Sequence, residues 1–335
     1  MLLTCQAGYE PLLARELTEL HGVTAGEKGP GWMRIGETDT PPHADLAFAH
    51  LALLEPVEVR GESVNALASR VAELFLNSLR NERIDAPWPN VWLGPAEMVG
   101  LGRRISAVEN AFAEQLKKKL SRVAKLADPG PPRGAGAARG LFVFFADFDR
   151  ALVSRTAWIH GPRRMADDPQ APSRSYLKVE EAYVVLGREP AAGETVCDLG
   201  AAPGGWSYSA ARHGASVLAI DNGPLKGGAL DHPQIEHRRE DAFKFAPAGG
   251  QSFDWLLCDL VEEPHHVVRD IVEPWLAHRW CRHFVVNLKF GRVDPVALLR
   301  ELRSPSSPLR AHAAEFRIHH LYHDREEFTV VGRLP

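Results

Sequence analysis

The carboxyl-terminal half of the chain alternates short apolar runs with amphipathic segments, and this alternation most limits the folds open to it. Strands are predicted at residues 195–199, 216–221, 255–260 and 284–289, and helices at 204–212, 267–277 and 295–302. A last pair of runs, 315–322 and 327–333, flanks a polar turn and predicts an antiparallel hairpin. The pattern is typical of a doubly wound α/β sheet, mostly parallel, with an antiparallel last strand. Such sheets bind ligands at the carboxyl ends of their strands.

The first 165 residues follow another pattern. Helices are predicted over 10–20, 64–79 and 105–120, with a strand at 32–35. Residues 128–140 are rich in Pro, Gly and Ala and predict a loop, which leads into strands at 141–145 and 151–157. A polar linker with three prolines, residues 161–173, is the best candidate for a domain boundary.

Length and composition favour an ordinary globular protein. The 335 residues are 45% hydrophobic, enough for two or three domains. No run reaches the about 18 apolar residues of a membrane span, and no signal peptide is evident, so a cytoplasmic protein without membrane contact is expected. The cysteines show no CxxC spacing and predict buried thiols, and no metal site is expected; they are Cys5, Cys197, Cys258 and Cys281.

The net charge of −4 is unevenly distributed along the chain. Residues 1–100 carry 7 basic and 14 acidic side chains, residues 101–174 carry 14 and 7, and residues 175–335 carry 18 and 22. A basic segment between acidic ones is typical either of a solvated surface or of a nucleic-acid site, and charge alone leaves both interpretations open.

A glycine-rich loop joins the first predicted strand of the carboxyl-terminal half to a helix. It reads Asp198-Leu199-Gly200-Ala201-Ala202-Pro203-Gly204-Gly205-Trp206. Glycines let the backbone turn tightly beside a ligand, and a helix start offers free N–H groups. The loop departs from the GxGxxG pattern of dinucleotide sites. Asp221 ends the second strand, where an acid suits a ribose, and Asp241 ends a presumed third strand, where an acid suits an adenine amino group.

This combination resembles the S-adenosylmethionine (AdoMet) methyltransferases, and the string DLGAAPGGWS is similar to the FtsJ-type ribose 2′-O-methyltransferases in particular. The resemblance implies a Rossmann-like methyltransferase sheet and AdoMet as cofactor. The cofactor-binding residues that it implies are Ser175, Gly200, Ala202, Pro203, Gly204, Gly205, Trp206, Asp221, Asp241 and Asp259.

FtsJ-type enzymes use a Lys-Asp-Lys-Glu tetrad, and the resemblance implies Lys178, Asp259, Lys289 and Glu327 as its members. Glu326 beside Glu327 leaves an ambiguity of one residue, and Glu327 is preferred because it directly precedes the apolar strand. Lys289 is the expected proton acceptor. A lysine that stays charged would instead steer the hydroxyl lone pair, and the sequence leaves both roles open.

Within this family the chain most resembles the RlmM group, which 2′-O-methylates a cytidine of 23S ribosomal RNA. SRSYLKVEEA, the terminal HDREEFTVVGRLP and the early Cys5…Gly8-Tyr9-Glu10 segment carry this resemblance. It implies a ferredoxin-like domain over 1–60, a THUMP-type RNA-binding domain over 61–165 and the methyltransferase domain over 166–335. A monomer is expected. The RNA-binding candidates are Lys117, Lys118, Arg163, Arg164 and Arg174.

Two alternative functions stay open at the level of sequence. The same tetrad would serve a 2′-O-methyltransferase acting on another RNA, such as transfer RNA. An RNA-binding or assembly factor with an inactive methyltransferase domain is the other alternative. An intact tetrad counts against it, because a decayed site would be expected to lose at least one member.

Overall fold

The chain forms two compact units, Met1–His160 and Gly161–Pro335. The computed structural model describes residues 1–36, 46–80 and 82–335. The division between the units falls at the start of the predicted polar linker, five residues before the boundary expected at 165. No helix in the described ranges is both long and apolar enough to cross a bilayer.

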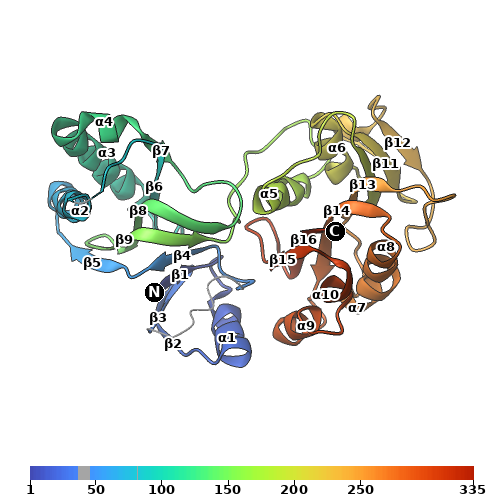
Figure 1. The fold of residues 1–335 in the computed structure, drawn as a ribbon, viewed down its shortest axis with the longest axis horizontal. Helices are drawn as coiled ribbons and strands as arrows, with labels where there is room; N and C mark the ends of the chain where they lie inside the picture. The colour runs from blue at the N-terminus through green and yellow to red at the C-terminus, as the bar shows by residue number, and fades with distance from the viewer. Residues whose placement is uncertain (37–45, 81) are drawn as a thin grey trace. The chain divides into compact units, whose positions relative to one another are not determined.

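Unit 1 is built on one mixed sheet (Figure 1). Its strands are β1 (Leu2–Thr4), β2 (Ala25–Gly29), β3 (Trp32–Ile35), β4 (Leu51–Leu54), β5 (Val57–Arg60), β6 (Trp88–Leu93), β7 (Ala127–Pro129), β8 (Gly136–Asp147) and β9 (Arg150–Ile159). Its helices are α1 (Glu10–His21), α2 (Val64–Ser78), α3 (Leu101–Lys119) and α4 (Ser121–Lys125). The strands lie in the order β2-β3-β1-β4-β9-β8-β6-β7, and β5 pairs with β9.

Helices α2 and α3 form where the helical periodicity predicted them. The Ser63 side chain caps α2 by accepting a hydrogen bond from Ala66 N at 3.1 Å. Helix α3 begins four residues earlier than expected, at Leu101, because that fully buried side chain continues the apolar stripe of Ile105 and Val108. The apolar stripes of both helices lie in one core cluster with residues of β6, β8 and β9, where Phe145 is fully buried.

The prediction of a loop over residues 128–140 is wrong at both ends. Strand β7 pairs with β6, and β8 begins at Gly136, five residues before the strand expected at 141. Gly136 aligns with Ile159 of β9, so a neighbouring strand supplies the pairing that the local composition did not indicate. Strand β4 also pairs with β9, and residues on both sides of position 60 therefore share one sheet. The ferredoxin-like and THUMP-type assignments stay predictions.

Unit 2 is the expected doubly wound sheet. Its strands are β10 (Thr195–Leu199), β11 (Ser216–Ile220), β12 (Ile235–Arg238), β13 (Phe253–Cys258), β14 (Cys281–Lys289), β15 (Glu315–His319) and β16 (Glu327–Arg333). They lie in the order β12-β11-β10-β13-β14-β16-β15. Neighbours from β12 to β14 run parallel, and β16 is antiparallel to both β14 and β15. This confirms the predicted fold class and the predicted hairpin.

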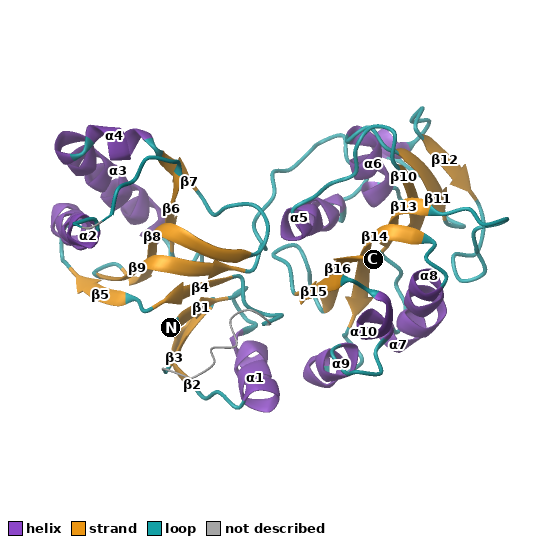
Figure 2. Cartoon of the chain, in the orientation of Figure 1, coloured by secondary structure: helices purple, strands orange, loops and turns teal. Residues whose placement is uncertain are grey.

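Helices cover both faces of this sheet (Figure 2). They are α5 (Tyr176–Leu186), α6 (Gly205–Arg212), α7 (Pro264–Val267), α8 (Glu273–Ala277), α9 (Pro295–Leu302) and α10 (Pro308–His312). The predicted helix 267–277 is instead α7, a π-helical segment Val268–Val272 and α8. Pro274 lacks the N–H that would continue a regular ladder, which accounts for the irregular hydrogen bonding before it. All four cysteines are free and buried, as predicted.

Candidate active site

The parallel strands bring three loop segments to one edge of the sheet. Leu199 at the end of β10 aligns with Ile220 of β11 and Cys258 of β13. Gly200 N donates to Ile220 O at 3.0 Å, and Asp259 N donates to Leu199 O at 3.3 Å. The glycine loop, Asp221 and Asp259 therefore leave the sheet side by side, at the edge where such folds bind ligands.

The glycine loop has a backbone that other residues would strain. Gly200 and Gly204 have φ angles of +79° and +107°. A Cβ atom on Gly204 would lie 2.5 Å from Ala229 Cβ. Asp221 holds the loop, because its carboxylate accepts from Ala202 N at 3.0 Å and from Gly223 N at 2.7 Å. Helix α6 starts directly after Gly204, so the N–H groups of its first turn lie at the end of the glycine loop and have no acceptor within the helix.

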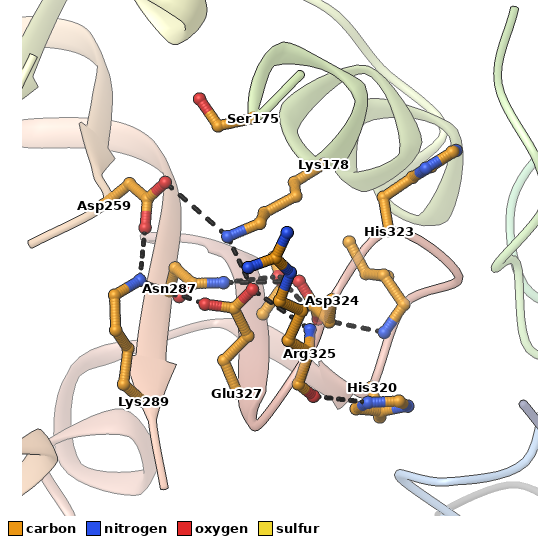
Figure 3. A network of polar contacts seen from close by, with 12 residues as sticks. Ser175, Lys178, Asp259, Asn287, Lys289, His320, His323, Asp324, Arg325 and Glu327 are labelled. Atoms are coloured by element: carbon orange, nitrogen blue, oxygen red, sulfur yellow. Dashed lines mark hydrogen bonds and ion pairs between the residues drawn. The ribbon is translucent and has the colours of Figure 1, made fainter. Parts of the chain in front are cut away.

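Four charged side chains from distant parts of the chain converge beside this loop (Figure 3). Lys178 comes from α5, Asp259 follows β13, Lys289 ends β14 and Glu327 begins β16. Lys289 Nζ lies 2.7 Å from Asp259 Oδ1 and 3.0 Å from Glu327 Oε2. Lys178 Nζ lies 2.5 Å from Glu327 Oε1 and 3.7 Å from Asp259 Oδ2. Each carboxylate thus faces both ammonium groups.

The hydrogen-bond register of β14 and β16 explains part of this convergence. Lys289 is the cross-strand partner of Glu327, so both side chains lie on the same face of the sheet. Glu327 is only 5% exposed, whereas the side chain of Glu326 is exposed. The one-residue ambiguity of the sequence is therefore resolved in favour of Glu327 as the member of the cluster.

Burial and charge oppose each other in this cluster. Burial acts to lower the pKa of Lys289, but Asp259 and Glu327 together outweigh it, and the pKa lies above the usual value. Burial acts to raise the pKa of Glu327, but Lys178 and Lys289 outweigh it and hold the pKa below the usual value. Lys289 is therefore an ammonium and Glu327 a carboxylate at neutral pH.

Sequence comparison assigns the family. The FtsJ-like methyltransferase family matches residues 171–283, which contain the glycine loop, Lys178 and Asp259. The ribosomal RNA large subunit methyltransferase M of Halorhodospira halophila is 33% identical over 99% of this chain and 96% of its own length. That of Stenotrophomonas maltophilia is 34% identical over the same shares of the two chains. The chain belongs to the ribosomal RNA large subunit methyltransferase M family.

Membership in this family identifies the chain as an AdoMet-dependent methyltransferase. Among solved structures, a putative methyltransferase complexed with SAH matches 100% of this chain and 97% of its own, at 12% identity and a TM-score of 0.38. The family assignment rests on the sequence relatives.

The groups around the glycine loop fit AdoMet. Ser173 Oγ and Ser175 Oγ lie 2.8 Å apart, and both would be within 3 Å of a Cβ atom on Gly205. These hydroxyls and the first-turn N–H groups of α6 suit a carboxylate, which the cofactor carries. Asp221, at the end of β11, is an acceptor for ribose hydroxyls. The glycine loop and the residues around it thus offer donors that suit the carboxylate of the cofactor and an acceptor that suits its ribose.

Two predicted cofactor residues differ from expectation. The Trp206 side chain is only 2% exposed and packs in the core, where its Nε1 donates to Ser175 O at 2.9 Å. The indole therefore supports the segment that carries Ser175 and does not face the loop. Asp241 does not close a strand, because β12 ends at Arg238, and its Oδ1 accepts from Phe243 N at 3.0 Å within a turn.

Several buried polar residues of this site escaped the sequence analysis. Asn287, Asp324 and Thr329 form a hydrogen-bonded group next to Lys289. The available signal was the period of two in β14, which puts Asn287 and Lys289 on one face. Glu181, fully buried on α5, accepts from the backbone N–H groups of residues 163, 322 and 323 and so anchors the turn that carries Asp324.

The predicted RNA-binding residues are divided between the two units. Lys117 and Lys118 are exposed on the last turn of α3, in unit 1. The three arginines belong to unit 2. Arg164 is exposed with its guanidinium 5.8 Å from the Tyr322 ring centroid, and Arg174 is exposed and paired with Asp167 at 2.8 Å. Arg163 is only partly exposed.

In residues 1–36, 46–80 and 82–335, no group of three His, Cys, Asp or Glu side chains is arranged to hold a metal ion. His319 and His320, which the sequence places next to each other near the last hairpin, are both buried.

Proposed function

We propose that this methyltransferase transfers the methyl group of AdoMet to the 2′-hydroxyl of a cytidine ribose in 23S ribosomal RNA. The convergence of Lys178, Asp259, Lys289 and Glu327 beside the glycine loop carries the proposal. The relatives named ribosomal RNA large subunit methyltransferase M support the substrate.

In this proposal the glycine loop and its neighbours hold the cofactor. The first-turn N–H groups of α6 and the Ser175 hydroxyl bind its carboxylate, the backbone from Gly200 to Gly205 follows its length, and Asp221 binds its ribose. Asp241 binds the adenine amino group. The bound cofactor supplies a methyl group that is already activated by the positive charge on sulfur.

The tetrad aligns and deprotonates the ribose hydroxyl. The 2′-oxygen would form a bond to the methyl carbon as the bond from that carbon to the cofactor sulfur breaks, so that S-adenosylhomocysteine would leave. The hydroxyl proton passes to Lys289, which must first have lost a proton of its own. Asp259 and Glu327 fix the Lys289 amine at the end of β14, at 2.7 and 3.0 Å. Lys178, the second cation on the same two carboxylates, competes with Lys289 for their charge and so eases its deprotonation.

The remaining parts of the chain hold the RNA in this proposal. Residues 1–60 and 61–165 act as ferredoxin-like and THUMP-type domains, and Lys117, Lys118, Arg164 and Arg174 contact phosphates. Arg163 contributes by supporting the linker, since its backbone N–H donates to Glu181 Oε1 at 2.8 Å. A cytoplasmic monomer fits a ribosomal RNA substrate.

Transfer of labelled methyl groups tests the proposal. We expect the wild-type protein to label 23S ribosomal RNA and the Lys289→Ala variant to lose at least 100-fold in rate, roughly the lower end of a general-base contribution. Mass spectrometry of the labelled RNA then locates the nucleotide. Wild-type activity in Lys289→Ala would overturn the proposed mechanism.

Three measurements distinguish this function from the two alternatives, methylation of another RNA and RNA binding without catalysis. Labelling of transfer RNA in place of 23S ribosomal RNA would replace the substrate and keep the chemistry. Absence of AdoMet binding in calorimetry would indicate an RNA-binding or assembly factor. A map of ribose methylation in ribosomal RNA from cells with and without the protein should lack one mark, at a cytidine.

A further inference from the structure

The structure assigns a positioning role to Asn287, which acts on Lys289 together with the buried pair Asp324 and Thr329. This inference deepens the proposed function and rests on Lys289 as the proton acceptor. It concerns residues behind the tetrad, none of which touches the ribose or the cofactor in the proposed mechanism.

Asn287 supplies the third acceptor for the Lys289 amine. Its side chain is fully buried on β14, two residues before Lys289 and on the same face of the strand. Asn287 Oδ1 lies 3.0 Å from Lys289 Nζ, in addition to the carboxylates of Asp259 and Glu327. An ammonium has three protons to donate, so these three acceptors account for all of them. The amine is therefore held in one position.

Asp324 and Thr329 accept hydrogen bonds from the NH₂ end of the Asn287 amide. Asn287 Nδ2 donates to Thr329 Oγ1 at 3.2 Å and to Asp324 Oδ1 at 3.3 Å. Thr329 is the cross-strand partner of Asn287, and its hydroxyl lies 3.0 and 3.1 Å from the two Asp324 oxygens. Burial raises the pKa of Asp324 to about 8, so at neutral pH its carboxyl group can donate as well as accept. The Lys289 ammonium only donates, so the Asn287 oxygen must face Lys289 and the NH₂ end faces Asp324 and Thr329.

The reversed amide is excluded by the same contacts. It would direct two N–H donors at the ammonium of Lys289, which has only donors of its own, and Asn287 is fully buried, so water cannot compensate. The turn holds Asp324 in place, because Leu321 N donates to its Oδ2 at 2.9 Å. Charge next to Lys289 thus comes from Asp259 and Glu327, with Lys178 as the opposing cation, while Asn287 contributes a neutral acceptor of fixed direction.

Removal of the Asn287 oxygen should weaken proton binding at Lys289. An Asn287→Leu variant keeps the approximate volume but loses one hydrogen bond to the ammonium. We expect the pKa of Lys289 to fall by about one unit, the lower end of what a hydrogen bond to a charged group contributes. Thr329→Val should lower the pKa by less, since Asp324 still orients the amide, and Thr329→Ser should leave it unchanged.

The pKa of Lys289 is measurable without catalysis. The rate of its acetylation by acetic anhydride is followed against pH in the full-length protein, with mass spectrometry of the peptide that contains Lys289. The melting temperature of each variant reports folding, and Thr329→Ser serves as the matched control for Thr329→Val. A pKa unchanged within 0.3 unit in folded Asn287→Leu and Thr329→Val would overturn the inference.

The pH dependence of methyl transfer completes the test. The acid limb of the rate profile should move to lower pH by the same shift, and the maximal rate should fall because the amine is no longer held. A merely structural defect would lower the rate without moving the acid limb of the pH–rate profile, and that result would contradict the inference. Absence of methyl transfer by the wild-type protein would defeat the proposed function, whereas the acetylation result bears on the Asn287 contact by itself.

Discussion

At the scale of single residues, the central feature is that the proposed base is held as an acid. Lys289 donates to two carboxylates and an amide oxygen, and its pKa lies above the usual value because the carboxylates outweigh the effect of burial. These contacts place the amine well, but they also make its proton hard to remove. The placement of the Lys289 amine and its availability as a base therefore oppose each other.

This opposition predicts how the rate depends on pH. A base with a raised pKa is largely protonated at pH 7, so single-turnover methyl transfer should rise about tenfold per pH unit from pH 7 to 9 and show no plateau there. Rapid-quench measurements with saturating RNA and AdoMet check this slope. A rate that is flat over this range and falls toward more alkaline pH would show that Lys289 acts as a charged group that steers the hydroxyl.

Two adjacent glutamates allow a matched substitution. Glu327→Gln removes the carboxylate shared by Lys178 and Lys289 and leaves two ammonium groups close together, so we expect a loss of at least 100-fold in the rate of transfer. Glu326→Gln makes the same chemical change at the exposed neighbouring residue, and its rate of transfer should stay within twofold of wild type. The rates are compared at saturating AdoMet, and equal rates for the two variants would contradict the assignment of Glu327.

At the scale of elements, the unit β10, glycine loop and α6 forms the cofactor side of the site. Its internal contacts are specific: Asp198 of β10 accepts from Ser207 Oγ of α6 at 2.6 Å, and burial raises the pKa of Asp198 to about 7. Asp221 ties the loop to the next strand. The loop conformation therefore depends on strand ends and on a helix start, and the glycines permit it.

Gly204→Ala should damage this element more than a matched control. Gly204 combines φ +107° with a Cβ clash at 2.5 Å, whereas Gly193 has φ +86° and no atom within 4 Å of a Cβ. We expect Gly193→Ala to lower the free energy of unfolding by about 1 kcal/mol and Gly204→Ala by about 2–4 kcal/mol, with weaker AdoMet binding only in the latter. Urea unfolding and calorimetry measure both, and equal losses would contradict the role of the clash.

At the scale of the whole molecule, charges that look separate in the sequence meet in the structure. Arg150 pairs with Glu27 and Glu58, and Arg139 and Arg155 pair with Glu82. The acidic first hundred residues thus neutralise part of the basic segment that follows them. That segment is also divided between the two compact units, since the boundary falls after His160. Its regional charge of +7 overstates the positive surface available to RNA.

Neutralising the exposed residues Arg164 and Arg174 should weaken RNA binding and leave AdoMet binding unchanged. For Arg164→Gln/Arg174→Gln we expect a lower affinity for 23S ribosomal RNA and a salt dependence smaller by roughly 1.4–1.8 in log–log slope, with unchanged AdoMet binding. The control is Arg238→Gln/Arg269→Gln, since these exposed arginines also pair with neighbouring acids. Filter binding at several salt concentrations measures the slopes. Equal slopes for the two double variants would indicate that Arg164 and Arg174 are solvated surface residues that do not bind RNA.

The sequence by itself determined the doubly wound sheet of unit 2 and the glycine loop, and its resemblance to the FtsJ-type enzymes implied the four charged residues that the structure brings together. The sheet and the loop depend on local periodicity and on residues at strand ends, which a parallel sheet brings to one edge whatever the details of packing. Only the tertiary structure decided that β8 begins at Gly136, that Trp206 lies in the core and that Asn287 completes the contacts of Lys289. Each of these depends on partners distant in the sequence, because strand pairing, burial and hydrogen-bond direction are set by the neighbours that folding supplies.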